Sequence, residues 1–534
     1  MHDSSHRSDA ANTLSGPGPA ITRGQWMALA AAILGWLFDG LEMGLFPLVG
    51  RDALRDLLQT ADEGLVGKWF GVMIAGFLVG AAAGGVLFGW LGDRVGRVRA
   101  MTFSVLTYAI FTGLCGVAAS AEQIFLFRFI ASLGMGGEWS LGVSLVMEIW
   151  PNKSRGWLAG LIGAASNVGF LAIAVIGLGL TQVISSFESG LQSIGLPDET
   201  VTRLVSYSGW RILMLFGAVP ALLTFFIRLF VPESQRWLHE RGTGTTSHWA
   251  TRDLIGVLAG TCGPLAMIYL WANDYSMTVR LVGSAVGLVV ALLGYLYPVW
   301  RYLGRALSGR EALSWSRGSV IGRMLIGAAL SGTALLGTWA SIQSAPSWAK
   351  TVAEAQAKRE QRSDEREKSM VTNAAAYTQI ASGLGAILGT ILAATIGLKM
   401  RRRTMYCILC LTALCSTLLL YQGNTWFFDR PPQFGAFLLG TMFLAGCFTA
   451  SFYGWLPLYL PELFPTAVRA TGQGFAFNFG RILAAVGALQ TGYLMNQVFD
   501  GDYARACSLM SVVYLVGLVI IWLAPETRGQ PLPE

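Results

Sequence analysis

Two acidic residues interrupt an apolar stretch near the N-terminus, 36-WLFDGLEMGLFPLV-49. Asp39 and Glu42 are three residues apart, so a helix would place both carboxylates on one broad face. An ionised carboxylate inside a membrane is costly, and such a residue is by default functional and needs a partner. These carboxylates would have to carry any transported proton, because no histidine falls in the expected membrane spans. The four histidines are His2, His6, His239 and His248.

The composition of the 534-residue chain is that of a polytopic membrane protein. Hydrophobic residues make up 53% of it and charged residues only 13%, with 65 glycines and 18 tryptophans. Its net charge of +7 does not indicate a nucleic-acid partner, because the basic residues fall mostly in short loops between apolar runs. The seven cysteines lie mostly in apolar segments, and Cys407 and Cys410 lack neighbouring histidine or acidic ligands. We therefore expect neither a metal site nor a cofactor.

Apolar runs long enough to cross a bilayer as helices predict about fourteen membrane spans. Alternating these spans from a cytoplasmic N-terminus places most arginine-rich loops inside, and both termini come out cytoplasmic. The charged segment 350–369 is the exception, and its mixed charge predicts a solvated external helix or a mobile loop. The approximate spans are 25–49, 69–91, 100–118, 122–148, 155–181, 210–230, 253–272, 279–298, 320–341, 372–397, 404–421, 434–459, 472–497 and 505–524.

A short pattern occurs twice, as 148-EIWPNKSR-155 and 462-ELFPTAVR-469. Each copy ends a long predicted helix, where proline can break the helix and the glutamate and arginine can pair across the turn. Two copies at matching helix ends predict two homologous halves, with two additional helices inserted between them. The expected organisation is a cytoplasmic tail (1–24), a six-helix bundle (25–231), a central cytoplasmic linker with two extra transmembrane helices (232–318) and a second six-helix bundle (319–534).

The stretch 89-GWLGDRVGRVR-99 resembles the signature loop of the major facilitator superfamily. Further matches to that superfamily are 134-GMGGEW-139, 209-GWR-211 with Pro220, 232-PESQRWL-238, 468-VRATGQGFAFNFGR-481 and 525-PETRG-529. The DGLE motif, the GMGGEW run and the two-helix insertion resemble the sialate and monocarboxylate proton-symporter branch, whereas the PES and PETRG elements are shared with sugar porters. The resemblance implies an all-α fold of two six-helix bundles, transport by alternating access, and a multi-pass carrier of a bacterial inner membrane that works as a monomer.

Charged residues at the ends of the predicted bundles form a candidate conformational latch. Asp93 can cap a neighbouring helix terminus or pair with an arginine where the bundles meet, a contact that must break when the carrier opens inward. In the second half, 389-GTILAATIGLKMRRR-403 resembles a degenerate copy, with Ala394 near the position of the acid. The alternative is that these arginines only mark the inner membrane face. The expected latch residues are Asp93, Arg94, Arg97, Glu148, Arg155, Glu462 and Arg469.

Glu42 and Arg128 form the candidate proton switch. If the first helix ends near Gly50 and the fourth begins near Glu122, both side chains lie roughly 9–10 Å below the outer boundary and can meet. In related proton-coupled carriers, an acid on the first helix and an arginine on the fourth form the protonation switch, and these two residues match those places. Asp39 would be a second member of the relay or a polar wall of the cavity. The alternative is a static ion pair that only fixes the two helices.

Four residues are candidates for contact with a substrate. Arg481 and Asn478 lie on a helix rich in small residues, and a lone membrane arginine needs an anion. Arg481 is therefore the first choice for a carboxylate clamp, and Arg128 is the second. Glu138 could line the cavity or bond to a neighbouring helix, and Trp139 could stack on a substrate ring, face lipid or fill the bundle.

The sequence thus predicts a secondary transporter that moves a small organic acid or acidic sugar, sialate- or lactate-like, together with protons. Its partners would be the small-molecule substrate, protons and the lipid bilayer. A neutral-sugar porter is the alternative within transport, and a non-transporting membrane sensor is the alternative outside it. No HExxH, no GxSxG in context and no paired aspartates on facing helices support an intramembrane enzyme.

Overall fold

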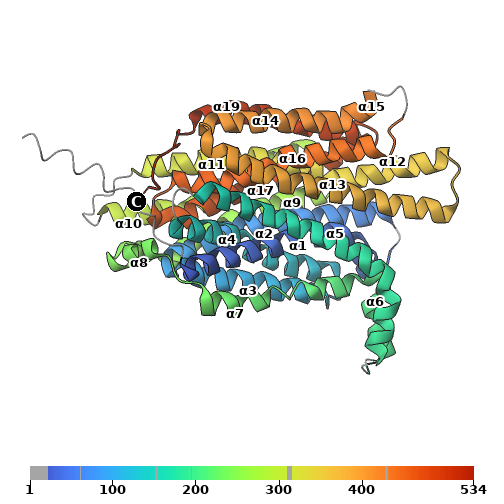
Figure 1. The fold of residues 1–534 in the computed structure, drawn as a ribbon, viewed down its shortest axis with the longest axis horizontal. Helices are drawn as coiled ribbons and strands as arrows, with labels where there is room; N and C mark the ends of the chain where they lie inside the picture. The colour runs from blue at the N-terminus through green and yellow to red at the C-terminus, as the bar shows by residue number, and fades with distance from the viewer. Residues whose placement is uncertain are drawn as a thin grey trace, which may run out of the picture.

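The computed structural model describes residues 22–60, 62–150, 154–193, 195, 197–308, 316–426 and 431–533. Every regular element in this part of the chain is a helix, and most helices run along one direction as a bundle (Figure 1). The first half forms α1 (Arg23–Leu58), α2 (Glu63–Val95), α3 (Arg97–Cys115), α4 (Ala121–Ile149), α5 (Arg155–Ser193), α6 (Asp198–Phe216) and α7 (Ala221–Phe230). The linker forms α8 (Gln235–Gly242), two short 3₁₀ turns, α9 (Leu254–Ala272) and α10 (Met277–Ser308). The second half forms α11 (Arg317–Ala340), α12 (Ala345–Arg359), α13 (Asp364–Lys399), α14 (Arg402–Leu418), α15 (Asn424–Trp426), α16 (Ala436–Tyr459), α17 (Arg469–Tyr493), α18 (Tyr503–Ser511) and α19 (Val513–Ile520).

Twelve helices of the described residues are long and apolar enough to cross a membrane, and the chain is a multi-pass membrane protein. The sequence predicted about fourteen spans. The expected span 210–230 is divided between α6 and α7, because the chain turns after Phe216 and restarts a helix at Pro220, which lacks the N–H needed to continue one. The expected span 472–497 corresponds mainly to α17, which packs against α2 and α11 although it carries Gln473, Asn478 and Arg481.

The structure corrects the expected end of the first helix, and it decides between the two alternatives for the segment 350–369. The first helix does not end near Gly50 but continues to Leu58, because Ala53 and Leu54 pack in a buried cluster against the rest of the first half. The charged segment 350–369 comprises the end of α12, a short turn and the beginning of α13, so most of it is helical.

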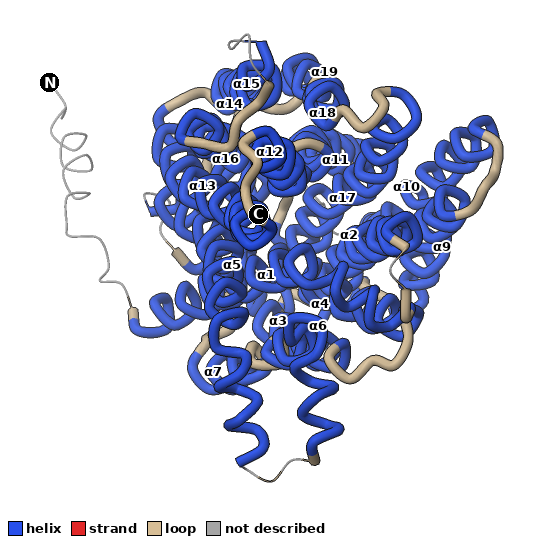
Figure 2. The backbone as a smooth tube through the Cα atoms, turned by 90° about the vertical axis from the view of Figure 1, so that its right-hand side faces the viewer, coloured by secondary structure: helices blue, strands red, loops and turns tan. Residues whose placement is uncertain are grey.

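The two halves meet along two helix pairs, α2 with α17 and α5 with α13 (Figure 2). At the first pair, a Cβ atom on Gly474 would lie 2.0 Å from the Gly85 carbonyl oxygen, so the backbones touch and only glycine fits. The described chain ends and α8 lie at one end of the bundle, which we call the terminal end, and α12 lies at the other, the distal end (Figure 1).

The inserted helices α9 and α10 pack against each other and lie beside α2 and α17 at the edge of the bundle (Figure 2). A Cβ atom on Gly294 of α10 would lie 2.4 Å from the Cα atom of Gly260 of α9, so glycines permit this close contact. At the terminal end, the buried Asp253 pairs with Arg305. The insert therefore spans the outer side of the α2–α17 contact and leaves the α5–α13 contact free.

Gly294→Leu should separate α9 from α10 and lower the stability of the insert. Overpacking a tight contact typically costs roughly 1–3 kcal/mol, so we expect a lower thermal unfolding midpoint in detergent. Gly322→Leu is the matched control, because a Cβ atom at Gly322 of α11 would meet no atom within 4 Å. Equal unfolding midpoints for the two variants would show that the glycine contact does not hold the insert together.

Candidate functional site

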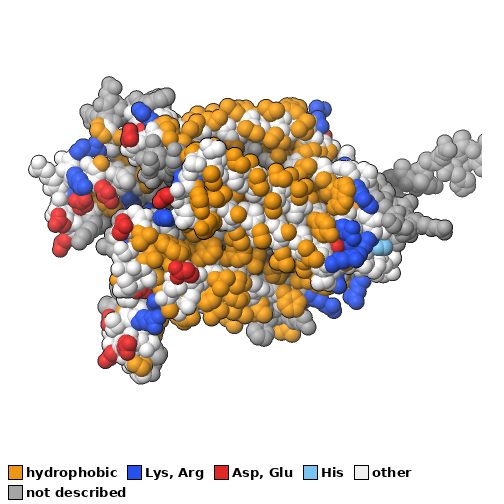
Figure 3. All heavy atoms as spheres, turned by 180° about the vertical axis from the view of Figure 1, so that it is seen from behind, with side chains coloured by type: hydrophobic (Ala, Val, Ile, Leu, Met, Phe, Trp, Pro, Cys, Tyr) orange, Lys and Arg blue, Asp and Glu red, His pale blue; other side chains and the backbone are white. Residues whose placement is uncertain are grey.

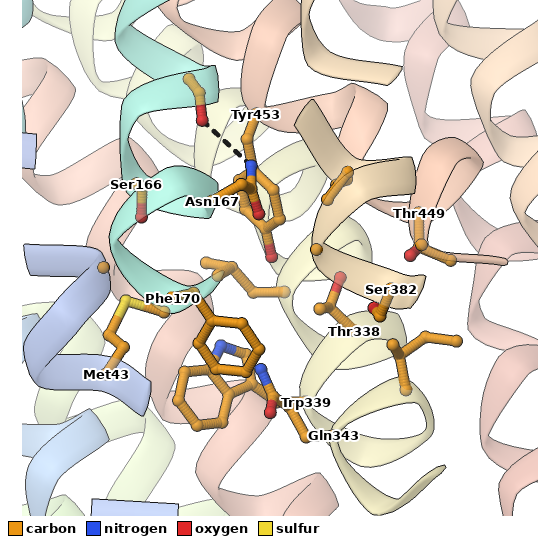
Figure 4. A pocket seen from close by; sticks show the side chains of 18 of the residues that line it. Met43, Ser166, Asn167, Phe170, Thr338, Trp339, Gln343, Ser382, Thr449 and Tyr453 are labelled. Atoms are coloured by element: carbon orange, nitrogen blue, oxygen red, sulfur yellow. Dashed lines mark hydrogen bonds between the residues drawn. The ribbon is translucent and has the colours of Figure 1, made fainter. Parts of the chain in front are cut away.

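A cavity of about 850 Å³, part of it open to solvent, lies between the two halves. Its wall is contributed by α1 and α5 from the first half and by α11, α13, α16 and α17 from the second half. Figure 4 shows aromatic and small polar side chains converging on it from several helices. The aromatic members are Trp36, Phe170, Trp339, Tyr453 and Phe477, and the uncharged polar members include Ser166, Asn167, Thr338, Gln343, Ser382 and Thr449.

The cavity is lined by one acidic and one basic side chain, each from a different half. Asp39 of α1 is 4% exposed, and its Oδ1 atom has no hydrogen-bond partner among the described residues. Arg481 of α17 is also buried, and its Nε and Nη1 atoms lack an acceptor in the described structure. The Arg481 guanidinium lies 5.6 Å from the ring centre of Phe477. The guanidinium thus has donors available for an anion inside the cavity.

Glu138 and Trp139 lie on α4 next to the cavity but do not line it. The Glu138 carboxyl lies beside the Asp39 carboxyl and the Tyr108 hydroxyl, and neither of its oxygens has a donor within the described chain. It occupies the space that a Cβ atom on Gly35 would need, with Oε1 only 1.5 Å from that position. Trp139 stacks on Phe477 at 3.9 Å between ring centres, so it supports an aromatic ring of the cavity wall from behind.

Glu42 and Arg128 are in contact, as their expected depths suggested. Arg128 Nη1 donates to Glu42 Oε1 at 3.1 Å, and both side chains are buried. The Arg128 guanidinium also lies 4.2 Å from the ring centre of Phe46 and 4.9 Å from that of Phe77, in cation–π geometry. Neither charged residue lines the cavity, so the structure separates this pair from Asp39, which faces Glu138 and the cavity instead.

Asn478 is not among the residues that line the cavity. Its side-chain amide Nδ2 donates to the Gly136 carbonyl of α4 at 2.9 Å. The residue therefore joins α17 to α4 across the two halves, next to the Gly85 contact.

Asp93 makes both of the contacts that the sequence offered as alternatives, a helix cap and an ion pair with an arginine. Its carboxylate accepts hydrogen bonds from the Thr471 backbone N–H at 2.8 Å and from the Thr471 hydroxyl at 2.6 Å, which caps the beginning of α17. It also pairs with Arg97 at 2.9 Å. One carboxylate of the first half is thus fixed to a helix terminus of the second half.

Glu148 extends this contact through two arginines. Its Oε1 atom accepts from Arg97 Nη2 at 3.2 Å and from Arg469 Nη1 at 3.0 Å, and its Oε2 atom accepts from the Ser234 hydroxyl. The expectation that Glu462 pairs with Arg469 within its own motif is wrong. Arg469 begins α17, and its side chain reaches Glu148 in the other half because the α2–α17 contact brings α4 within reach.

The described residues of the second half repeat part of this charge network. Arg402 pairs with Glu462 at 2.8 Å and donates to the Gly397 carbonyl, as Arg97 donates to Gly92. This register places Leu398, not Ala394, at the position of Asp93. A Cβ atom on Gly156 of α5 would lie 2.1 Å from Leu398 Cγ, so an apolar contact replaces the carboxylate.

One expected latch residue, Arg94, lies apart from this network. The side chain of Arg94 is directed to the insert, where Nη1 donates to the Thr251 hydroxyl at 2.6 Å, because it lies on the outer face of α2 over Trp90. Arg94 therefore makes its described contacts with Thr251 and Trp90 and not with the charge network. The side chain of Arg155 falls outside the described part of the structure.

Sequence reasoning missed two acids that complete the networks. Glu233 accepts from the Arg97 backbone N–H at 2.9 Å, and Glu526 accepts from the Arg402 backbone N–H at 3.0 Å, so each caps the helix after a signature loop. Burial raises the pKa of the Glu233 carboxyl despite these donors. The sequence contains a signal for these two acids, because each belongs to one copy of a repeated motif, Pro-Glu-Ser or Pro-Glu-Thr.

Together these contacts close the terminal end of the bundle below the cavity. Asp93→Asn removes the charge that faces both Arg97 and the start of α17, so the terminal end should open more often. A charged hydrogen bond contributes roughly 1.5–3 kcal/mol, so we expect at least about a tenfold rise in opening. The measurement is the maleimide labelling rate of Ser144→Cys, a buried α4 position that faces Gln473, after replacement of the seven native cysteines.

Arg94→Ala is the matched control for this labelling experiment, because Arg94 contacts the insert and not the network. Its labelling rate should equal that of the parent protein. An unchanged rate in Asp93→Asn would show that the carboxylate does not hold the terminal end closed.

Comparisons with known proteins agree with this architecture. A profile of the family described as "Sugar (and other) transporter" matches residues 28–255 and 337–534, and the stretch between them contains α10 and most of α9 and α11. A putative metabolite transport protein of Haemophilus influenzae is 24% identical over 508 residues, covering 95% of this chain and 98% of that protein. A cis,cis-muconate transport protein of Acinetobacter baylyi is 24% identical over 509 residues, covering 95% of each chain. The structure of the proton:xylose symporter XylE bound to 6-bromo-6-deoxy-D-glucose has a TM-score of 0.62 at 19% identity, covering 95% of this chain and 98% of that one. The chain belongs to the sugar (and other) transporter family and is a secondary transporter of the major facilitator class.

Proposed function

We propose that this transporter moves a small organic carboxylate or acidic sugar together with protons by alternating access. The observation that carries the proposal is the Arg481 guanidinium, which faces the cavity with two nitrogen atoms unpaired among the described groups. A buried cation in that state favours an anionic ligand, and a planar guanidinium suits a carboxylate. The muconate name of one relative supports the same substrate class.

We further propose a bacterial inner-membrane location with the terminal end in the cytoplasm. On the face drawn in Figure 3, lysine and arginine side chains gather at one end of the apolar belt, whereas acidic side chains are more frequent at the other. The positive-inside rule places the basic end in the cytoplasm. With that orientation, both chain termini are cytoplasmic.

The aromatic residues of the cavity favour a substrate with a flat or apolar body. Phe170 of α5 and Trp339 of α11 both line the cavity, and Trp36 and Phe477 add further rings. The Asn167 amide and the Ser166 hydroxyl would bind hydroxyl or carbonyl groups of the same substrate.

Purified protein in proteoliposomes should accumulate labelled carboxylates under an inward-directed proton gradient. The probes are cis,cis-muconate, lactate and sialate, with a hexose for comparison. Arg481→Ala should raise the half-saturating concentration of the transported carboxylate roughly 10- to 100-fold, because a charged hydrogen bond contributes roughly 1.5–3 kcal/mol. Arg481→Lys should be intermediate, since it keeps the charge and loses the planar donor pair.

Arg505→Ala is the matched control for Arg481, because Arg505 is an exposed arginine of the same half with 71% of its side chain accessible. Its transport should equal that of the wild type. Uptake of hexose alone by the wild-type protein would overturn the carboxylate proposal in favour of a neutral-sugar porter.

Glu42 is proposed as one proton site of the cycle. Protonating it would leave the buried Arg128 without its anion, but the Phe46 and Phe77 rings would still hold the guanidinium in place. The pair can therefore change its protonation state without losing its geometry.

Glu42→Gln should lower the steady-state accumulation of the carboxylate under a pH gradient, because glutamine imitates the protonated acid and cannot release a proton. Exchange of internal for external substrate should persist, since it needs no net proton movement. Glu122→Gln, which alters an exposed acid in the first turn of the same α4 that carries Arg128, should behave as wild type. Normal accumulation by Glu42→Gln would leave the Glu42–Arg128 pair with a structural role only.

A further inference from the structure

We propose that Asp39 and Glu138 form a second proton-binding site, and that an anion bound to Arg481 determines how many protons the site holds. This inference rests on the proposed carboxylate transport. It goes beyond that proposal because it names the carboxyl pair that takes up a proton when substrate binds. Asp39 faces the cavity, and Glu138 lies directly behind it.

The geometry brings the two carboxyl groups together, with the Tyr108 hydroxyl beside Glu138. Asp39 and Glu138 are 4% and 1% exposed, and neither Glu138 oxygen has a hydrogen-bond partner in the described structure. Gly35 provides the space for the Glu138 carboxyl against α1, one helical turn before Asp39. Two adjacent buried carboxyl groups repel each other when both are ionised, and they attract each other when they share a proton.

The charged and titratable groups around this pair come from five helices. Glu42 is on the same helix as Asp39, Arg128 is on α4, Tyr108 on α3, Tyr453 on α16 and Arg481 on α17. Glu42 and Arg128 neutralise each other at 3.1 Å. The remaining ionisable charges are therefore two carboxylates, Asp39 and Glu138, and one guanidinium, Arg481.

Charge neutrality then links proton binding to substrate binding. With the cavity empty, Arg481 balances one carboxylate, so the pair needs one proton. When a monocarboxylate binds Arg481, three anionic groups face one cation, and the pair needs a second proton. Uncompensated charge is expensive in this buried setting, so each bound monocarboxylate should bring one proton with it. No covalent bond changes, and the proton comes from the solvent side that supplies the substrate.

The test is proton uptake on binding, measured with purified full-length protein in weakly buffered detergent solution. A pH-indicator dye reports protons, and titration calorimetry separately reports binding of cis,cis-muconate, lactate and sialate. The carboxylate that binds best should take up roughly one proton per molecule when it is a monoanion, and its affinity should fall up to about tenfold per pH unit as the pH rises. Glu42→Gln and the exposed control Glu122→Gln should keep this uptake.

Charge neutrality predicts different proton uptake for the single and double variants of Asp39 and Glu138. Asp39→Asn and Glu138→Gln should each retain the uptake of one proton, because the remaining carboxyl still loses Arg481 to the substrate. The double variant Asp39→Asn/Glu138→Gln should bind the carboxylate with no proton uptake and with little dependence on pH.

Three results would overturn the shared site. They are carboxylate binding by the wild type without proton uptake, loss of uptake in either single variant or in Glu42→Gln, and undiminished uptake in the double variant. A wild-type protein that binds none of the carboxylates would instead refute the proposed function itself. The wild-type and single-variant results can each overturn the shared site by themselves, so the proposal stays falsifiable even if the double variant does not fold.

Discussion

The Glu148 carboxylate is shared by two arginines that belong to different halves of the chain. Arg97 approaches it from α3 and Arg469 from α17, and all three side chains are fully or almost fully buried. Removing one partner from such a buried group costs roughly 3–5 kcal/mol. Moving α17 away from α4 would take Arg469 from Glu148, so this contact favours the arrangement in which the two helices are adjacent. This contact lies at the terminal end, and the cavity lies between α1, α5, α11, α13, α16 and α17.

The charged residues in and beside the cavity are paired less completely than those of the network. In the network, almost every charged atom has a partner on a neighbouring helix, whereas Asp39, Glu138 and Arg481 have unpaired atoms within the described structure. Unpaired buried charge destabilises a protein, and it is retained where a ligand or proton supplies the missing partner. The cost of unpaired buried charge therefore stabilises the contacts at the terminal end, and in the cavity it favours binding of a ligand or a proton.

The sequence predicted the helical membrane fold well, because long apolar runs determine membrane helices almost independently of tertiary contacts. It also predicted the Glu42–Arg128 contact, from the expected helix depths together with the family resemblance, although α1 continues past Gly50 to Leu58. It did not predict that Asp39 lies beside Glu138, because that contact depends on how α1 and α4 are rotated about their axes and on the space left at Gly35. The pairing of Arg469 with Glu148 was missed for a related reason: a repeated motif suggests local pairing, and only the α2–α17 contact makes the longer connection possible.

The internal repeat explains why the two contacts between the halves differ. Both copies keep an arginine, a glutamate and a capping acid, but Asp93 in the first copy is replaced by Leu398 in the second. Separating α2 from α17 at the terminal end requires water to replace the bonds of Asp93, whereas separating α5 from α13 disrupts apolar packing around Leu398. The inserted helices α9 and α10 lie along the charged contact only, and Arg94 connects that side of α2 to Thr251 of the linker. Among the described residues, the charged contacts between the halves and the added helices therefore lie on the same side of the bundle.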